Sequence, residues 1–360
     1  MNKISNTLKT SISGLNIETL KEKLDEFNFP AFKINVLHEW LYKKYINSFD
    51  EISSLSKKDR EILENDFLFS SIKLNKKEIS KDGTIKYLWE LSDGNYIESV
   101  RMIMNDEKTY TVCISSQVGC AVGCVFCATG KLKLKRNLTS QEIVEQVLNI
   151  QRDTKERIDN IVYMGQGEPL HNYDEVVKSI KLIREDVGIG ARHITVSTSG
   201  IPDKIKQLAD EKIPFTLAIS LHSPDQKTRE LLVPIAKRYK MDELFEAIHY
   251  FYNKTKRRIT IEYVMLNELN DSSNQAKALS DLTKGLHCHI NLIPYNPIHH
   301  SFTADNKTIN LERTPIKKII AFREVLEKSS RKKATIRHER GLDINAACGQ
   351  LANTANNLII

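Results

Sequence analysis

The chain has 360 residues, of which 41% are hydrophobic, and a formal net charge of +7. This size allows a large buried core, and the absence of any run of about 18 apolar residues argues against a membrane span. The first residues lack the apolar stretch of a secretory signal, so we expect a cytoplasmic protein. In that compartment six cysteines, four of them clustered, favour a metal or redox site over a disulfide scaffold.

Two small modules are predicted before the main body of the chain. Residues 1–75 are expected to form a helical, RNA-contacting module, because apolar residues recur three and four apart between about 15 and 70, with a break at Pro30. Residues 76–110 contain TIKYLWEL and NYIESVRMIM, which alternate as strands do, joined by the turn signal SDGN. They predict a β-hairpin extension.

From residue 106 to 343 the pattern changes to alternating strands and helices. The β-branched runs are YTVCISS, NIVYMG, HITVSTSG, FTLAISLH, ITIEYVML and HINLIPYN, with amphipathic helical segments between them. Six such units predict an α/β fold with a parallel sheet, closed into a partial (β/α)6 TIM-like barrel. KATIRHER predicts one further strand before a C-terminal tail, residues 344–360. The polar motifs follow the strands directly, where barrel enzymes place their sites.

Three cysteines, Cys120, Cys124 and Cys127, follow the first strand at the spacing C-x3-C-x2-C. Structural zinc normally takes four ligands, and no nearby His or Cys supplies the fourth. An iron–sulfur cluster with three cysteine ligands leaves one iron open for a substrate. The loop, with Phe126 before its last cysteine and GQGEP after the next strand, resembles the motif of the radical S-adenosylmethionine (SAM) superfamily. That resemblance implies a [4Fe–4S] cluster on these cysteines and SAM at the open iron; a zinc knuckle is the alternative.

Further candidate cofactor ligands lie at the ends of later strands. Small residues at Gly165 and Gly167 permit close approach of a ligand to the backbone. The resemblance assigns Gly167 and Glu168 to the methionine amino group of SAM. Hydroxyl, imidazole and amide groups at the other strand ends could reach the ribose, carboxylate or adenine, although capping a turn is the common role of such residues. These candidates are Ser197, Ser220, Leu221, His222 and Asn296.

The remaining cysteines differ in their surroundings. Cys288, in LHCHINLI, is assigned to packing. Cys348 lies in IRHERGLDINAACGQLA, which closely resembles the C-terminal signature of the RlmN/Cfr family of RNA adenine methyltransferases. CISSQVGC around Cys113, the GEPL element, RNL at residues 136–138 and NLIPYNP also fit that family, and the resemblance extends over nearly the whole chain.

The resemblance implies a mechanism with two SAM molecules. Cys348 accepts a methyl group from the first, and a radical from the second activates that methyl group for addition to the adenine ring. Glu98 accepts the ring proton, and Cys113 resolves the covalent protein–RNA adduct by forming a disulfide with Cys348. The implied substrate is carbon 2 of an adenosine in the peptidyl-transferase centre of 23S ribosomal RNA, with some transfer RNAs as second substrates. The implied protein partner is an electron donor of the flavodoxin or ferredoxin type. We expect a monomer that does not associate with a membrane.

Three alternatives remain open at this point. A Cfr-type enzyme would methylate carbon 8, but Pro169 in GEPL favours carbon 2. A glycyl-radical activase would leave Cys113 and Cys348 without a role, and a zinc-containing RNA-binding module would need no SAM. RNA contacts are expected at Lys43 and Lys44 and along residues 131–137, where basic residues cluster.

Overall fold

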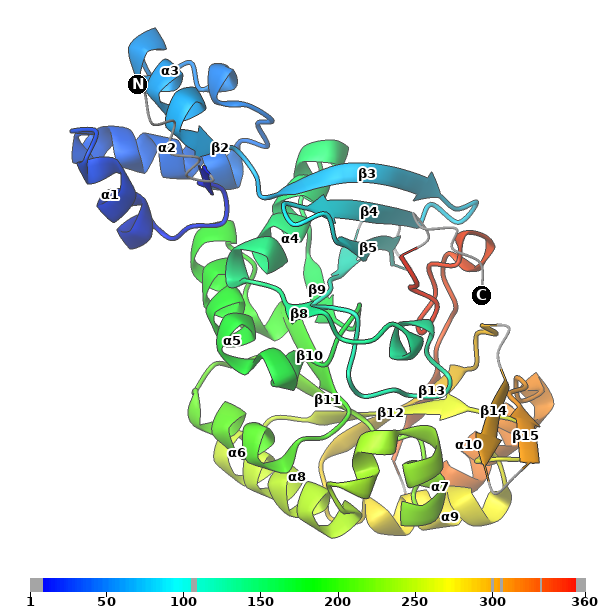
Figure 1. Ribbon diagram of the computed structural model, residues 1–360. Helices are drawn as coiled ribbons and strands as arrows, with labels where there is room; N and C mark the ends of the chain where they lie inside the picture. Colours follow the sequence, from blue (N-terminus) through cyan, green and yellow to red (C-terminus); the bar gives the residue numbers. More distant parts are fainter. Residues whose placement is uncertain (1–8, 105–108, 299–300, 305–306, 331, 354–360) are drawn as a thin grey trace.

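The computed structural model describes residues 9–104, 109–298, 301–304, 307–330 and 332–353. Parts of the expected helical module, residues 1–8, and of the expected tail, residues 354–360, therefore lie outside the described residues. The described chain forms an N-terminal group of helices, an antiparallel extension and a curved parallel sheet with helices on its outer face (Figure 1).

Helices dominate the first described residues, as the periodicity predicts. They are α1 (Ile17–Asp25), α2 (Ala31–Lys43) and α3 (Lys57–Asp66). Asn16 caps α1 by accepting a hydrogen bond from the Thr19 N–H, and Pro30 is the N-cap residue of α2. Two short strands, β1 (Thr10–Ser11) and β2 (Phe67–Leu68), pair in parallel and join the two ends of this helical group. Neither strand is evident from the sequence, because two residues carry no periodicity.

The main sheet has ten strands within the described residues, in the order β16-β13-β12-β11-β10-β9-β6-β5-β4-β3. The parallel strands are β6 (Tyr110–Cys113), β9 (Asn160–Tyr163), β10 (Ile194–Thr198), β11 (Thr216–Ser220), β12 (Ile259–Met265), β13 (Cys288–Pro294) and β16 (Ala334–Ile336). Each falls within a predicted β-branched run. The expected partial (β/α)6 barrel is confirmed, with β16 extending it on one side.

The expected hairpin is present as β4 (Ile85–Leu91) and β5 (Tyr96–Ile103). It continues the main sheet, because β5 pairs antiparallel with β6, and it gains a third strand, β3 (Ile72–Ile79). Strand β3 runs across residue 75, where we expected the helical module to end. Its mostly exposed residues lack the apolar alternation that would have revealed it.

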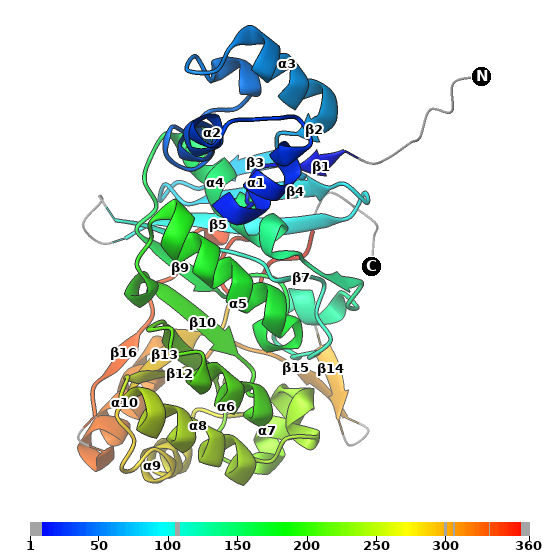
Figure 2. The same cartoon turned by 90° about the vertical axis from the view of Figure 1, so that its left-hand side faces the viewer.

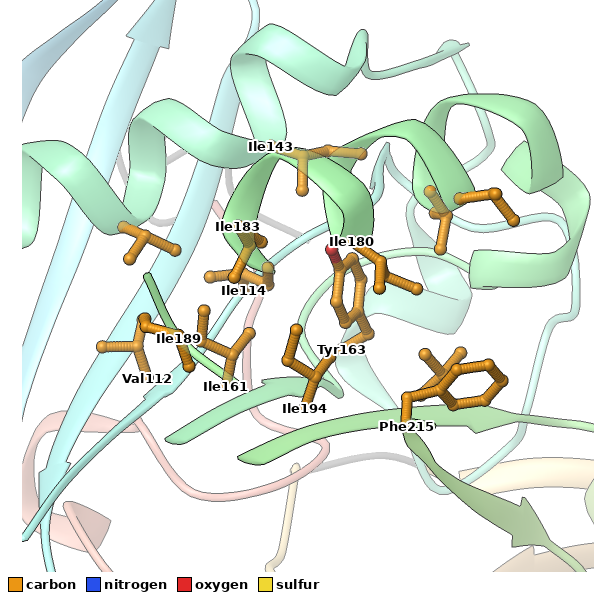
Figure 3. Packing of buried hydrophobic residues seen from close by; sticks show 14 of the residues in the cluster. Val112, Ile114, Ile143, Ile161, Tyr163, Ile180, Ile183, Ile189, Ile194 and Phe215 are labelled. Carbon is orange, nitrogen blue, oxygen red and sulfur yellow. The ribbon is translucent and has the colours of Figure 1, made fainter. Parts of the chain in front are cut away.

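Helices cover the convex face of the barrel (Figures 1 and 2). They are α4 (Ser140–Thr154), α5 (Tyr173–Leu182), α6 (Pro202–Asp210), α7 (Gln226–Leu232), α8 (Met241–Thr255), α9 (Ser273–Leu282) and α10 (Ile316–Ser330). Figure 3 shows the resulting core: Val112, Ile161 and Ile194 on the strands face Ile143 of α4 and Ile180 of α5. These branched side chains are buried between the strands and the helices. The ends of the strands are therefore the part of the sheet that is open to a ligand.

Two small hairpins lie outside the main sheet. Strands β7 (Gln117–Val118) and β8 (Arg136–Asn137) pair across the base of the cysteine loop, and β14 (Ser301–Ala304) pairs with β15 (Lys307–Asn310). No helix in the described part of the chain is long and apolar enough to span a membrane.

Candidate active site

The cysteine loop is held rigidly at the carboxyl end of β6. Its base is closed by the β7–β8 pair, and the Val125 N–H donates to the Leu232 carbonyl of α7 at 3.1 Å. At its far side the Ala128 N–H donates to the Gly349 carbonyl at 2.7 Å. Gly349 has φ +85°, a conformation in which a side chain would be strained, so glycine lets the tail approach the loop closely. The loop and the C-terminal tail therefore share one surface.

A cavity of about 950 Å³, including its mouth, opens at the carboxyl ends of the strands. Most of the predicted cofactor and metal ligands line it, although they come from separate parts of the chain. Those lining residues are Cys120, Cys124, Cys127, Gly167, Glu168, Ser197, Ser220, His222, Asn296 and Cys348. Leu221 is different: its side chain is part of the apolar core, and its N–H donates to the Glu262 carbonyl at 3.1 Å.

The three loop thiols fit an iron–sulfur cluster better than a single zinc ion. Within the described ranges, no three His, Cys, Asp or Glu side chains converge on a point that one metal ion could occupy. In a cluster each thiolate binds a different iron, so the sulfurs need not converge. Burial raises the pKa of Cys120 to about 12 and the pKa of Cys124 well above its ordinary value. Thiolates in this enclosed environment need nearby positive charge, which bound iron would supply.

Glu168 is oriented by its own surroundings. Its Oε2 accepts hydrogen bonds from the Ser199 N–H and hydroxyl, both at 2.7 Å, and its Oε1 accepts from the Leu170 N–H at 3.0 Å. Gly167 precedes it at φ +100°, where a Cβ would lie 2.6 Å from the Cβ of Gln117. Oε1 keeps a further lone pair, so Glu168 can accept from an ammonium group in the cavity.

His222 is held neutral. Its Nδ1 accepts the Val264 N–H at 3.0 Å, which assigns the ring proton to Nε2. Burial lowers its pKa to about 3, and its ring contacts Phe126 edge-on at 4.7 Å. The hydroxyls of Ser197 and Ser220 lie 3.3 Å apart on the same wall. Together these groups offer neutral hydrogen bonds suited to ribose or adenine.

Cys348 lies in the wall between the first cavity and a second one of about 550 Å³. Cys113 lines the second cavity, and Arg337 and Asn296 line both. Asn296 donates from Nδ2 to the Cys348 carbonyl at 3.0 Å, while its buried Oδ1 has no partner. Both cysteines are free thiols. The predicted methyl carrier and its predicted resolving thiol are thus brought to one place.

Arg337 was not predicted, and with Arg340 it brings positive charge to the lining of this second cavity. The pKa of Arg337 is raised, above all by Cys348, and Glu262 and Cys113 act in the same direction. Burial raises the pKa of Cys113 to about 12 and Cys348 adds to that effect, whereas Arg337 opposes it. Arg337 directly follows β16, so its place after a predicted strand was the available signal. For Glu262, inside β12, no such signal exists.

Glu98 lines neither cavity. It is fully buried on β5, and its Oε2 accepts the N–H groups of Ala352 and Asn353 at 2.8 and 3.0 Å. Its Oε1 has no hydrogen-bond partner and lies 3.7 Å from Nζ of Lys86. Burial raises the pKa of Glu98, although the two amides and Lys86 oppose this. The predicted proton acceptor is therefore covered by the tail that carries Cys348.

Lys86, on β4, holds the other side of that tail. Its Nζ donates to the Ile344 carbonyl at 2.6 Å and lies 3.1 Å from Glu78 Oε2. Figure 1 shows the tail (red) beside the β3–β5 extension. Lys86 and Glu98 thus anchor the backbone on both sides of Cys348.

Comparison with known proteins agrees with this geometry. Residues 114–276 match the model of the radical SAM superfamily. The "Probable dual-specificity RNA methyltransferase RlmN" of Clostridium novyi (strain NT) is 45% identical over 344 residues, which cover 95% of this chain and 97% of the relative. The chain belongs to the RlmN family of radical SAM RNA methyltransferases. A relative with the same name from Thermotoga neapolitana is 43% identical over 344 residues, covering 95% of this chain and 97% of that one.

A solved structure supports the radical SAM methyltransferase fold over nearly the whole chain. The crystal structure of a radical SAM methyltransferase from Sphaerobacter thermophilus superposes with a TM-score of 0.88 at 38% identity, covering 96% of this chain and 99% of that one. The family uses a [4Fe–4S] cluster and SAM, which confirms the expected cofactors. It also excludes the zinc module and the glycyl-radical activase considered above.

Two predicted RNA-contacting residues have other partners. Arg136 pairs with Asp93 and with Glu142, and Nζ of Lys135 donates to Asn95 Oδ1 at 2.9 Å. These contacts tie the cysteine loop to the β4–β5 turn. Lys131, Lys133 and Lys135 are all exposed in that segment, and Lys43 and Lys44 are exposed on the helical module.

Proposed function

We propose that this RNA methyltransferase methylates carbon 2 of an adenosine in 23S ribosomal RNA, and of an adenosine in transfer RNA, through an S-methylcysteine at Cys348. The observation that carries the proposal is the position of Cys348 between two cavities. One cavity holds the predicted SAM ligands, and the other holds Cys113. The relatives are named dual-specificity RNA methyltransferases, which supports two RNA substrates.

Cys348 acts as a nucleophile in the first step. A bond forms between its sulfur and the methyl carbon, and the bond between that carbon and the sulfonium sulfur breaks. Arg337 assists by stabilising negative charge on the sulfur, an attraction reflected in its own raised pKa. When bound, the cluster and SAM supply the methyl group, a reducing electron and the radical that activates the methyl carbon.

Glu98 and Cys113 complete the reaction. A carboxylate whose pKa is raised by burial takes up a proton more readily than an exposed one, and Oε1 of Glu98 is the oxygen left without a donor. Glu98 accepts the proton from the ring carbon that the Cys348 methylene group has joined, and the ring radical gives up one electron, which the bound cluster would take back. The thiolate of Cys113 attacks the sulfur of Cys348: the S–S bond forms, the bond between that sulfur and the methylene carbon breaks, and the carbon takes up a proton to leave as the methyl group of the modified RNA.

Carbon 2 is preferred to carbon 8 because Pro169 follows Glu168 in the GEPL element. Pro169 begins a short 3-10 turn, Pro169–Asn172, behind the cavity wall. The remaining expectations belong to the same proposal. The protein works as a cytoplasmic monomer, receives electrons from a flavodoxin or ferredoxin, and contacts RNA through exposed lysines. The four predicted parts have separate roles. Residues 1–75 contact RNA, residues 76–110 form the β-hairpin extension, residues 106–343 form the radical SAM barrel, and residues 344–360 form the tail with Cys348.

The position of the methyl group tests the proposal. Anaerobically reconstituted protein is given reductant, SAM with a deuterated methyl group, and transcripts of 23S and transfer RNA. The nucleosides are separated by liquid chromatography beside standards of both isomers and detected by mass spectrometry. We expect 2-methyladenosine; 8-methyladenosine instead would establish the Cfr-type reaction. Cys348→Ala should give no product while keeping its iron and sulfide, and Cys288→Ala, a matched cysteine on β13, should keep full activity. Product formed by Cys348→Ala would overturn the S-methylcysteine route.

A further inference from the structure

Arg229 on α7 is a buried cation without a counter-ion. The residue has 0% of its surface exposed. One guanidinium nitrogen, Nη2, donates to the backbone carbonyl of Ser199, while Nε and Nη1 have no partner in the described part of the chain. No carboxylate therefore compensates this charge. A buried guanidinium with two nitrogens, and thus three N–H groups, unused is costly, which indicates an anion that these side chains do not supply.

The position of Arg229 points to the cysteine loop. Helix α7 is joined to that loop by the hydrogen bond from Val125 to Leu232, and Arg229 lies one turn before Leu232. Val122 and Cys124 of the loop pack with Leu232 in one apolar cluster. Burial lowers the pKa of Arg229 to about 10, and the one group that opposes this is the thiol of Cys124. The loop that carries Cys124 thus adjoins the helix of Arg229, and a thiolate at Cys124 would bring negative charge toward the guanidinium.

The SAM carboxylate is the other anion that this site could receive. Arg229 is absent from the residues that line the SAM cavity, whereas Cys124 and Ser199 line it. The guanidinium consequently lies behind the cavity wall, on the side of the thiolates. The anion that Arg229 faces is therefore the cluster with its ligand Cys124, and not the SAM carboxylate in the cavity.

We infer that Arg229 is a positioning residue for the iron–sulfur cluster, holding a positive charge behind Cys124 that raises the cluster's reduction potential. Positive charge and hydrogen bonds close to cluster sulfur favour the form that has gained an electron. In a low-dielectric interior this effect is stronger than at the surface. Arg229 would therefore ease reduction of the cluster by its electron donor, the step that precedes cleavage of SAM, without touching SAM or RNA.

The test is a redox titration of the reconstituted protein, followed by electron paramagnetic resonance, with neither SAM nor RNA present. For Arg229→Met we expect the ratio of reduced to oxidised cluster at a fixed potential to fall about tenfold, which is about 59 mV for one electron. Arg229→Lys keeps the charge and should shift the midpoint less. Lys227→Met removes an exposed charge from the same helix and should leave the midpoint unchanged.

A fully loaded Arg229→Met protein whose midpoint equals that of the wild type would overturn the inference. If a separate binding titration of that protein also shows weakened SAM binding, Arg229 is instead a ligand of the cofactor carboxylate. Should Arg229→Met fail to hold a cluster, Arg229→Gln, which keeps amide donors but removes the charge, decides: a midpoint equal to that of the wild type counts against the inference. Because RNA is absent, none of these outcomes depends on where the methyl group is placed.

Discussion

Two buried carboxylates of this protein hold chain segments in place, yet they differ in how completely they are satisfied. Glu145 on α4 receives hydrogen bonds at both oxygens, from Ser11 and from the linker residues Ser70, Ser71 and Ile72. Glu98 receives two tail amides at Oε2 and none at Oε1. Glu145 joins the helical module to the barrel, whereas Glu98 joins the tail to the extended sheet.

In the proposed mechanism the difference separates a structural carboxylate from a reactive one. Hydrogen-bond donors at both oxygens offset the cost of burial, and Glu145 has five donors from two segments. A buried oxygen without a hydrogen-bond donor has a cost that folding alone does not explain. Glu98 lies on β5, which is next to β6 in the sheet, and Val100 of β5 pairs with Cys113 of β6. The region around Glu98 is accordingly where we expect substitutions to change chemistry and not stability.

The largest effect is expected from Cys113→Ala. If the Glu98 region is reactive, removing the resolving thiol should stop the reaction after the RNA has joined Cys348, with turnover reduced at least ~100-fold. A covalent protein–RNA species should accumulate on denaturing gels and disappear after nuclease treatment. The substitution removes a small buried side chain, so folding and cluster content should change little. Normal turnover without any adduct would remove Cys113 from the resolving role.

A smaller effect is expected from Lys86→Met. Its loss leaves the Ile344 carbonyl without its donor and removes a charge that lowers the pKa of Glu98. Losing a charged hydrogen bond of ~1.5–3 kcal/mol corresponds to a roughly tenfold or greater fall in methylation rate. The acid limb of the pH–rate profile should also move to higher pH, which loosening of the tail alone would not produce.

Two variants of similar size act as controls for Lys86. Lys86→Arg keeps the charge and should recover most of the rate. Lys76→Met removes an exposed lysine that pairs with the same Glu78 and should resemble the wild type. Equal behaviour of Lys76→Met and Lys86→Met would mean that Glu78, and not the tail, is the important partner.

The smallest effect, on stability alone, is expected from Glu145→Gln. Burial raises the pKa of Glu145 to about 7 from its ordinary 4.5. The folded state therefore holds this proton more tightly than the unfolded state, and the stabilisation, fully present below pH 4.5, is lost as the pH rises through about 7. The loss amounts to about 3 kcal/mol. In Glu145→Gln that contribution is absent, so stability should fall less between these pH values.

Urea unfolding of both proteins at pH 5 and pH 7.5 measures this difference. The methylation rate per folded molecule should be equal in the two proteins, because Glu145 lies outside both cavities. Parallel losses of stability in wild type and variant would show that Glu145 does not titrate in this range. A fall in catalytic rate at constant stability would end the contrast between Glu145 and Glu98.

Most of the fold and of the cofactor cavity could be predicted from the sequence. The β-branched runs identified the parallel strands, and the motifs after them converge because parallel strands end at one edge. Leu221 was predicted as part of that site, but its side chain packs in the core. Strand β3 was missed because its exposed residues show no alternation, and β1 and β2 because each has only two residues.

The sequence by itself determined the order of the parallel strands and of the helices between them, since periodicity is a property of neighbouring residues. Close spacing predicted the three cluster cysteines, and a family resemblance predicted the roles of Cys113 and Cys348. Only the tertiary structure decided the partners of the buried charges. Arg229, Arg337 and Lys86 resemble ordinary surface residues in the sequence, and their surroundings come from segments far away along the chain. Whether a charge is paired, unpaired or covered depends on that assembly, because burial and hydrogen bonding are set by the neighbours that folding brings together.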